Sequence, residues 1–102
     1  MARPTLPIRE KDFLQAVKEL AQLQGWLTYH TWNSQHSPAG FPDLVLVRPP
    51  RLVFAELKVG RNRPTPAQQE WLRQLGACPQ AEVYLWTPDC WQEIERVLRR
   101  ER

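Results

Sequence analysis

Two short apolar runs joined by a pair of prolines limit the possible folds of this chain more than any other feature. They are DLVLV (residues 43–47) and LVFAELK (residues 52–58), with RPPR between them. Both runs are apolar at successive positions, which is typical of strands buried on both faces. The sequence therefore predicts two adjacent buried strands. We expect a loose loop between them, because a Pro-Pro pair does not fit a tight primed hairpin turn.

Prolines and glycines divide the rest of the chain into helical and extended segments. Apolar residues at helical spacing predict a helix over residues 8–24, which Gly25 would end. Alternating and aromatic residues predict strands over residues 26–32 and 81–87.

Two further helices are marked by their starting residues. Thr65 and Pro66 suit the cap and first position of a helix that runs to about residue 75. Thr87 or Asp89 would cap the last helix. The order α-β-β-β-α-β-α predicts an α/β domain with a mixed sheet flanked by helices.

The 102-residue chain is long enough for one domain with a modest core. It contains no apolar run long enough to span a membrane and no visible signal peptide. Its two cysteines, Cys78 and Cys90, have neither metal-ligand spacing nor a disulfide framework, so we expect a cytoplasmic protein. The net charge of +3 is weak evidence for a nucleic-acid partner. Five basic residues within one window are either phosphate contacts or a solvated face: Arg48, Arg51, Lys58, Arg61 and Arg63.

Three ionisable residues stand at the ends of the two buried runs. Glu56 and Lys58 share one face of their strand, and antiparallel pairing would bring Asp43 to the same edge of the sheet. Two carboxylates suit Mg²⁺ or Mn²⁺, which can polarise a phosphoryl oxygen and activate water. A lysine beside them can stabilise charge on a phosphate. The alternative is a buried salt bridge at the end of a sheet.

The spacing of Pro42-Asp43, twelve residues and then Glu56-Leu57-Lys58 resembles the PD-(D/E)XK nuclease superfamily. The wider segments FLQAVKELAQLQGWLTYHT, GFPDLVLV, VFAELK and TPAQQEWL are similar to its VRR-NUC branch, in particular to small stand-alone viral or bacterial members. The resemblance covers residues 10–98. It implies a single VRR-NUC-like nuclease domain over residues 1–102 with a restriction-endonuclease-like mixed sheet.

The resemblance implies a role for each matching residue. Asp43 and Glu56 would be metal ligands, with the backbone carbonyl of Leu57 as a third, and Lys58 would orient or activate the attacking water. Two more catalytic candidates are Gln68 and Glu10, and Glu10 is also a further metal-ligand candidate.

Both supporting candidates have a structural alternative. Gln68 could close a capping box with Thr65, and Glu10 could complement the helix dipole. Glu19 competes with Glu10 but lies off the apolar stripe of the first helix.

We therefore expect a Mg²⁺- or Mn²⁺-dependent endodeoxyribonuclease that acts on branched DNA such as four-way (Holliday) junctions. A symmetric junction suits a homodimer; no membrane partner is expected, and a viral protein would work in the host cytoplasm. The alternatives are an inactive DNA-binding or assembly module on the same fold and a sequence-specific restriction-type nuclease. Candidate DNA contacts are Arg48, Arg51, Arg61, Arg63, His30 and Trp32.

Overall fold

The structure, a computed structural model, describes residues 8–32 and 36–100 of the chain. Its elements follow the predicted order, with one short 3₁₀ turn (η1) added before the last helix. They are α1 (Glu10–Leu23), β1 (Leu27–His30), β2 (Leu44–Arg48), β3 (Arg51–Leu57), α2 (Pro66–Gly76), β4 (Ala81–Trp86), η1 (Pro88–Cys90) and α3 (Trp91–Leu98).

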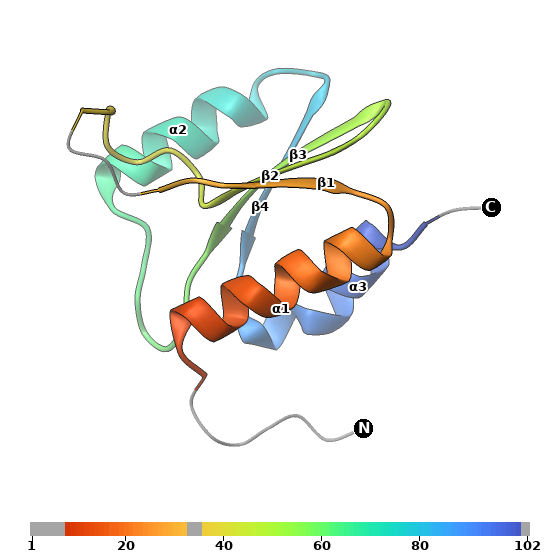
Figure 1. Ribbon diagram of the computed structural model, residues 1–102. Coiled ribbons are helices and arrows are strands. Elements are labelled where there is room, and N and C mark those ends of the chain that lie inside the picture. Colours follow the sequence, from red (N-terminus) through yellow and green to blue (C-terminus); the bar gives the residue numbers. More distant parts are fainter. Residues whose placement is uncertain (1–7, 33–35, 101–102) are drawn as a thin grey trace.

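The four strands form one mixed sheet in the order β1-β2-β3-β4. β2 lies antiparallel to both β1 and β3, whereas β3 and β4 are parallel and joined through α2. Helices α1 and α3 lie side by side on one face of the sheet, and α2 lies on the other (Figure 1). The predicted fold class, a mixed sheet flanked by helices, is thus confirmed.

The two faces of the sheet are buried to different extents. The face under α1 and α3 holds the core, whereas α2 has no buried residue and leaves its face of the sheet half-exposed. In the part of the chain that the structure describes, no helix has the length and apolar character to cross a membrane. The apolar core consists of Phe13, Val17, Ala21, Trp26, Leu44, Leu46, Val53, Ala55, Leu57, Trp86, Ile94 and Leu98.

The connection between β2 and β3 is tighter than the predicted loose loop, so that prediction was wrong. Arg48 pairs directly with Arg51, which leaves only Pro49 and Pro50 in the turn. The peptide bond between the two prolines is cis. A cis proline at the third position of a tight turn is typical of type VI turns, which are distinct from the primed hairpin turns.

The helix ends differ slightly from the prediction. α1 begins at Glu10 rather than at residue 8 and is followed by Gly25, whose φ of 87° is the left-handed conformation expected after a helix. The last α-helix begins at Trp91, because residues 88–90 first form η1, in which the Cys90 amide donates to the Thr87 carbonyl over 2.8 Å. Neither predicted cap residue stands at the start of α3.

Arg48, at the turn end of β2, ties the ends of α1 and α3 together. Its guanidinium donates to the carbonyls of Gln24 (2.7 Å) and Leu98 (3.2 Å) and lies 4.6 Å from the centre of the Trp26 ring. Carbonyls at helix C-termini lack helical partners and attract positive charge. Arg48 therefore satisfies groups that the helices themselves leave open.

Arg51, across the turn from Arg48, joins β3 to β4 and α3. Two of its nitrogens donate to the two carboxylate oxygens of Glu82, each over 2.7 Å, and a third donates to the Val97 carbonyl over 2.8 Å. Its guanidinium also lies 4.9 Å from the Trp26 ring centre. This bidentate ion pair is the strong kind, because both partners are ionised and their geometries match.

We expect Arg51→Lys to lower the free energy of unfolding by about 1–2 kcal/mol, because a lysine cannot make the bidentate contact and reach Val97 as well. Urea unfolding followed by tryptophan fluorescence measures the change. Arg73→Lys is the matched control, since Arg73 pairs with Glu70 on the exposed face of α2 and should leave the midpoint unchanged. Equal effects of the two substitutions would contradict this account of Arg51.

Candidate active site

Asp43, Glu56 and Lys58 meet at the end of β2 and β3 that lies away from the turn. The register pairs Leu44 with Ala55, so Asp43 comes opposite Glu56. An Asp43 carboxylate oxygen accepts a hydrogen bond from the Leu57 amide over 2.8 Å. The side chain of Asp43 therefore continues the link between the two strands where their ladder ends.

Among the residues that the structure describes, Glu56 is the one buried residue with a polar or charged side chain. It has no exposed surface, and its carboxylate lies 3.2 Å from the Lys58 amino group. Neither carboxylate oxygen has a hydrogen-bond partner of good geometry. A buried carboxylate in this condition costs free energy unless a cation or a proton satisfies it.

Burial, with the charge of Asp43 as the second cause, raises the pKa of Glu56 from its ordinary value of 4.5 to about 7. Lys58 acts in the opposite direction and does not cancel the two effects. Burial and the neighbouring carboxylate thus disfavour the ionised form of Glu56, and a cation at the site would favour it.

The segment GFPD, which precedes β2, is held against α2. Gly40 has a φ of 100°, and a Cβ there would lie 2.6 Å from the backbone of Ala67. The Phe41 ring packs edge-on against Phe54, with ring centres 6.0 Å apart, and against Trp71 at 5.1 Å. Gly40 allows the chain to pass close to α2, and Phe41 packs against Trp71 of that helix. Together they fix the position of the chain just before Asp43 and β2.

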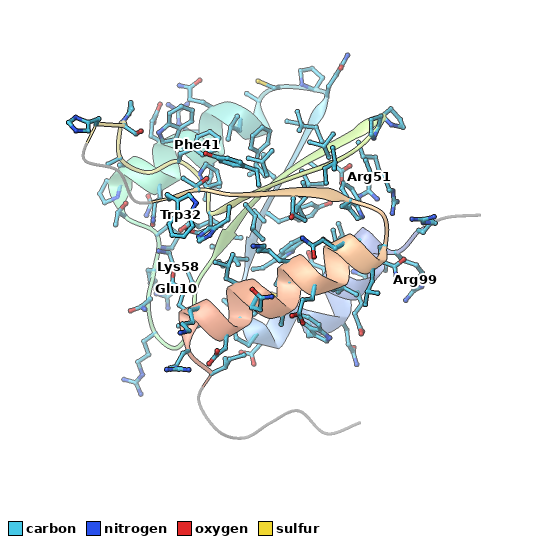
Figure 2. All side chains as sticks on the ribbon, viewed as in Figure 1. Glu10, Trp32, Phe41, Arg51, Lys58 and Arg99 are labelled. Atoms are coloured by element: carbon cyan, nitrogen blue, oxygen red, sulfur yellow. The ribbon has the colours of Figure 1, made fainter. Side chains whose placement is uncertain are left out.

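A pocket of about 250 Å³ adjoins Asp43 between the start of α1 and the end of the sheet. Its lining brings two of the predicted residues, Glu10 and His30, to Asp43, whereas Glu19 lies elsewhere on α1 and accepts from Gln15. Figure 2 shows Glu10, Lys58 and Trp32 at the same end of the molecule. The lining residues are Glu10, Lys11, Leu14, His30, Asp43 and Leu57.

Gln68 forms a capping box with Thr65, the structural alternative to its predicted catalytic role. The side-chain oxygen of Gln68 accepts from the Thr65 backbone amide over 2.9 Å, and the backbone amide of Gln68 donates to the Thr65 hydroxyl over 3.1 Å. A catalytic role for Gln68 stays a prediction and would require its side chain to leave this cap.

The structure does not bring all the predicted DNA contacts to the pocket. Arg48 and Arg51 lie at the opposite end of the sheet, where their guanidinium groups hold the helix ends and Glu82. Figure 2 places Arg51 far from Lys58. Arg61 and Arg63 are exposed in the connection that follows Lys58, and Trp32 is 75% exposed beyond β1.

Sequence reasoning missed two residues near Asp43. Lys11 lines the pocket; its position three residues before Leu14 is the same helical signal that singled out Glu10. Thr31 donates through its amide to the Asp43 carbonyl over 2.9 Å and through its hydroxyl to the Pro42 carbonyl over 2.7 Å. No local pattern marks Thr31, because its role depends on the pairing of β1 with β2.

The donor set fits a hard divalent cation. Among residues 8–32 and 36–100, no group of three or more His, Cys, Asp or Glu side chains could hold a metal. A cation would therefore depend on Asp43 and Glu56 together with backbone, phosphate or water oxygens, which is how Mg²⁺ is usually bound. The oxygens of Glu56, which lack a hydrogen-bond partner, support this fit.

Comparison with known proteins identifies the architecture. Neither a protein-family model nor a curated protein matches the sequence. A solved structure described as a VRR_NUC domain matches with a TM-score of 0.67 and 20% identity, over 87% of this chain and 92% of that one. A second, described as a VRR_NUC domain protein, matches with a TM-score of 0.66 and 17% identity, over 94% and 95% of the two chains. The chain therefore has the fold of a VRR-NUC domain, as its sequence resemblance predicted.

Proposed function

We propose that this protein is a metal-dependent DNA endonuclease that hydrolyses phosphodiester bonds at the end of β2 and β3. The observation that carries the proposal is the buried carboxylate of Glu56, which faces Asp43 and whose oxygens lack hydrogen-bond partners. A salt bridge with Lys58 alone would leave these oxygens poorly satisfied, so the arrangement favours a cation site. The VRR-NUC fold of the two similar structures supports the same reading.

We assign each residue of the site a role that suits its place in the structure. Asp43 and Glu56 would hold Mg²⁺ or Mn²⁺ with the Leu57 carbonyl. Such an ion neutralises phosphate charge and makes water more acidic. Lys58, 14% exposed beside Glu56, would orient the attacking water or stabilise charge on the phosphate. Glu10 lies on the other wall of the pocket, where it would add a further acidic group.

We propose branched DNA, such as a four-way junction, as the substrate. Arg61 and Arg63, exposed just after Lys58, would contact backbone phosphates, which contribute affinity rather than sequence reading. The three α-helices of the described residues lie on the faces of the sheet (Figure 1), and we assign none of them to base reading in a groove. This argues against the sequence-specific restriction-type alternative, whereas an inactive DNA-binding module would have no need of Lys58 beside two carboxylates.

We expect Asp43→Asn and Lys58→Ala each to slow DNA cutting by roughly 100-fold or more, because each removes a group that acts on the reacting phosphate. The assay incubates each protein with supercoiled plasmid, linear duplex or a four-way junction in Mg²⁺, Mn²⁺ or EDTA. The wild-type protein should cut the junction fastest and should cut nothing in EDTA.

The matched pair Glu10→Gln and Glu19→Gln tests the acid on α1. Only Glu10→Gln should slow cutting, since Glu19 lies away from the pocket. Cutting that survives EDTA or Asp43→Asn would contradict the metal site. Equal cutting of junction and linear duplex would contradict the structure preference, and binding without cutting in any metal would favour the inactive module.

The raised pKa of Glu56 predicts how stability depends on pH without metal. Below the ordinary value of 4.5 the carboxyl is protonated in both states, and its contribution is fully present; as pH rises through about 7, the folded state must ionise a buried group. From pH 5 to 8 in EDTA, the wild-type free energy of unfolding should fall by about 1–3 kcal/mol relative to Glu56→Gln. Urea unfolding at both pH values measures the difference.

Added Mn²⁺ at pH 8 should restore most of this loss in the wild-type protein and little of it in Glu56→Gln, because binding to the folded state alone stabilises it. Glu19→Gln serves as the surface control and should respond to pH and Mn²⁺ as the wild type does. The same pH dependence in wild type and Glu56→Gln would rule out Glu56 as the titrating group.

We further propose that the protein works as a homodimer that pairs through β1. β1 is an edge strand of the sheet, and exposed edges with apolar side chains are normally covered. Leu27 is 74% exposed and Tyr29 60% exposed, and both lie on the same face of this edge strand. A two-fold pair would present two sites to a symmetric junction.

Light scattering during size exclusion should give a mass twice 12.0 kDa for the wild-type protein. The double substitution Leu27→Lys and Tyr29→Lys should give the monomer, because it places charge on the proposed contact. Leu85→Lys, on the opposite edge strand, should leave the dimer intact. A monomeric wild type, or a double variant that remains dimeric, would contradict this interface.

A further inference from the structure

Beside the pocket lies an aromatic pair that the proposed cutting chemistry does not use. The ring centres of His30 and Trp32 are 5.1 Å apart, with their planes at 39°. His30 lines the pocket with Asp43, whereas Trp32 keeps 75% of its surface exposed. An exposed tryptophan ring beside a polar site has a large flat surface that suits contact with a ligand.

The pair is fastened to the strand that carries Asp43. Thr31, which lies between His30 and Trp32 in the sequence, donates through its amide to the Asp43 carbonyl (2.9 Å) and through its hydroxyl to the Pro42 carbonyl (2.7 Å). His30 itself pairs with Leu44 in the sheet. These bonds hold the aromatic rings at a set position relative to the carboxylate, so a ligand there loses little freedom to protein rearrangement.

The pair belongs to the pocket rather than to the proposed dimer contact. His30 lies opposite the buried Leu44 and therefore faces the α1 side of the sheet, whereas Leu27 and Tyr29 are at alternate positions on β1 and face the other side. Trp32 contacts His30 and is thus directed to the pocket side.

The chemistry of the surroundings selects the kind of ligand. Lys11 and Lys58 offer positive charge near the carboxylates of the site, and this suits a phosphate. A flat ring next to a phosphate site suits a nucleobase, because every base has a face that stacks on aromatic rings. In continuous duplex DNA that face is covered by neighbouring bases, so only an unpaired nucleotide can present it.

We propose that His30 and Trp32 form a subsite that stacks an unpaired base next to a phosphate contacted by Lys11 and Lys58. The inference rests on the proposed function and gives it a physical source of selectivity. A branch point or bulge offers such a base, whereas a continuous duplex does not. Trp32 then determines specificity by binding and has no part in the chemical step.

Binding in EDTA tests the subsite without cutting. Fluorescence anisotropy measures the affinity of wild type, Trp32→Ala and Trp32→Phe for a paired duplex, the same duplex with one unpaired nucleotide, and that bulged duplex with an abasic site in place of the unpaired base. Trp32→Ala should weaken binding to the bulge by roughly 5- to 100-fold and leave the paired duplex unchanged. Trp32→Phe should retain most of the affinity, because phenylalanine still stacks.

The abasic bulge separates stacking from other contacts. The wild-type protein should bind the abasic bulge about as weakly as Trp32→Ala binds the normal bulge. The affinity of Trp32→Ala should be the same for the abasic bulge and the normal bulge. Leu85→Ala, another exposed apolar residue but on β4, is the control and should bind all three DNAs as the wild type does. Thermal unfolding and size exclusion establish that each variant is folded and has the wild-type mass.

Two results would overturn the subsite: equal loss on all three DNAs, or no loss on the bulge. Because no metal or cutting is needed, this failure is distinct from that of the nuclease proposal. Cutting that depends on Asp43 without any Trp32 effect would remove the subsite alone. A Trp32 effect without cutting in any metal would remove the nuclease and leave a DNA-binding site for unpaired bases.

Discussion

The antiparallel pairing of β2 with β3 is the constraint on which the rest of the structure depends. It starts from the two-residue turn at Pro49-Pro50 and runs until Asp43 meets Glu56 at the other end. Every strand pair adds hydrogen bonds along this length, and the Asp43 carboxylate closes it by accepting from the Leu57 amide. A slip of one residue would move the apolar side chains to the wrong face and separate the two carboxylates.

The two ends of this hairpin serve opposite purposes. At the turn end, Arg48 and Arg51 donate hydrogen bonds to helix carbonyls, and Arg51 also pairs with Glu82. The positive charges there therefore stabilise the fold. At the open end, Glu56 is buried beside Lys58, its oxygens lack hydrogen-bond partners, and burial raises its pKa. The molecule is thus stabilised where its charges are matched, whereas the unmatched carboxylate at the open end is the feature on which the proposed cation site rests.

Local patterns were sufficient for most of the fold and for the centre of the candidate site. The meeting of Asp43 with Glu56 followed from an antiparallel hairpin, since any register that buries both apolar runs brings these ends together. The structure does not bring Arg48 and Arg51 to this site, because residues close in sequence to Lys58 lie a full strand length away from it in space. Gln68 shows another limit of sequence patterns. The pattern Thr65-x-x-Gln68 forms a helix cap, and the same pattern is compatible with a catalytic glutamine.

By itself, the sequence determined the order of the elements and the convergence of Asp43, Glu56 and Lys58, because strand alternation and hairpin pairing are local rules. Only the tertiary structure decided that Glu56 is fully buried, that Glu10, Lys11 and His30 line a pocket with Asp43, and that Thr31 fastens an exposed Trp32 beside it. These features depend on how α1 packs across the sheet and on which edge β1 occupies, and contacts between segments distant in the chain leave no periodic signal in the sequence.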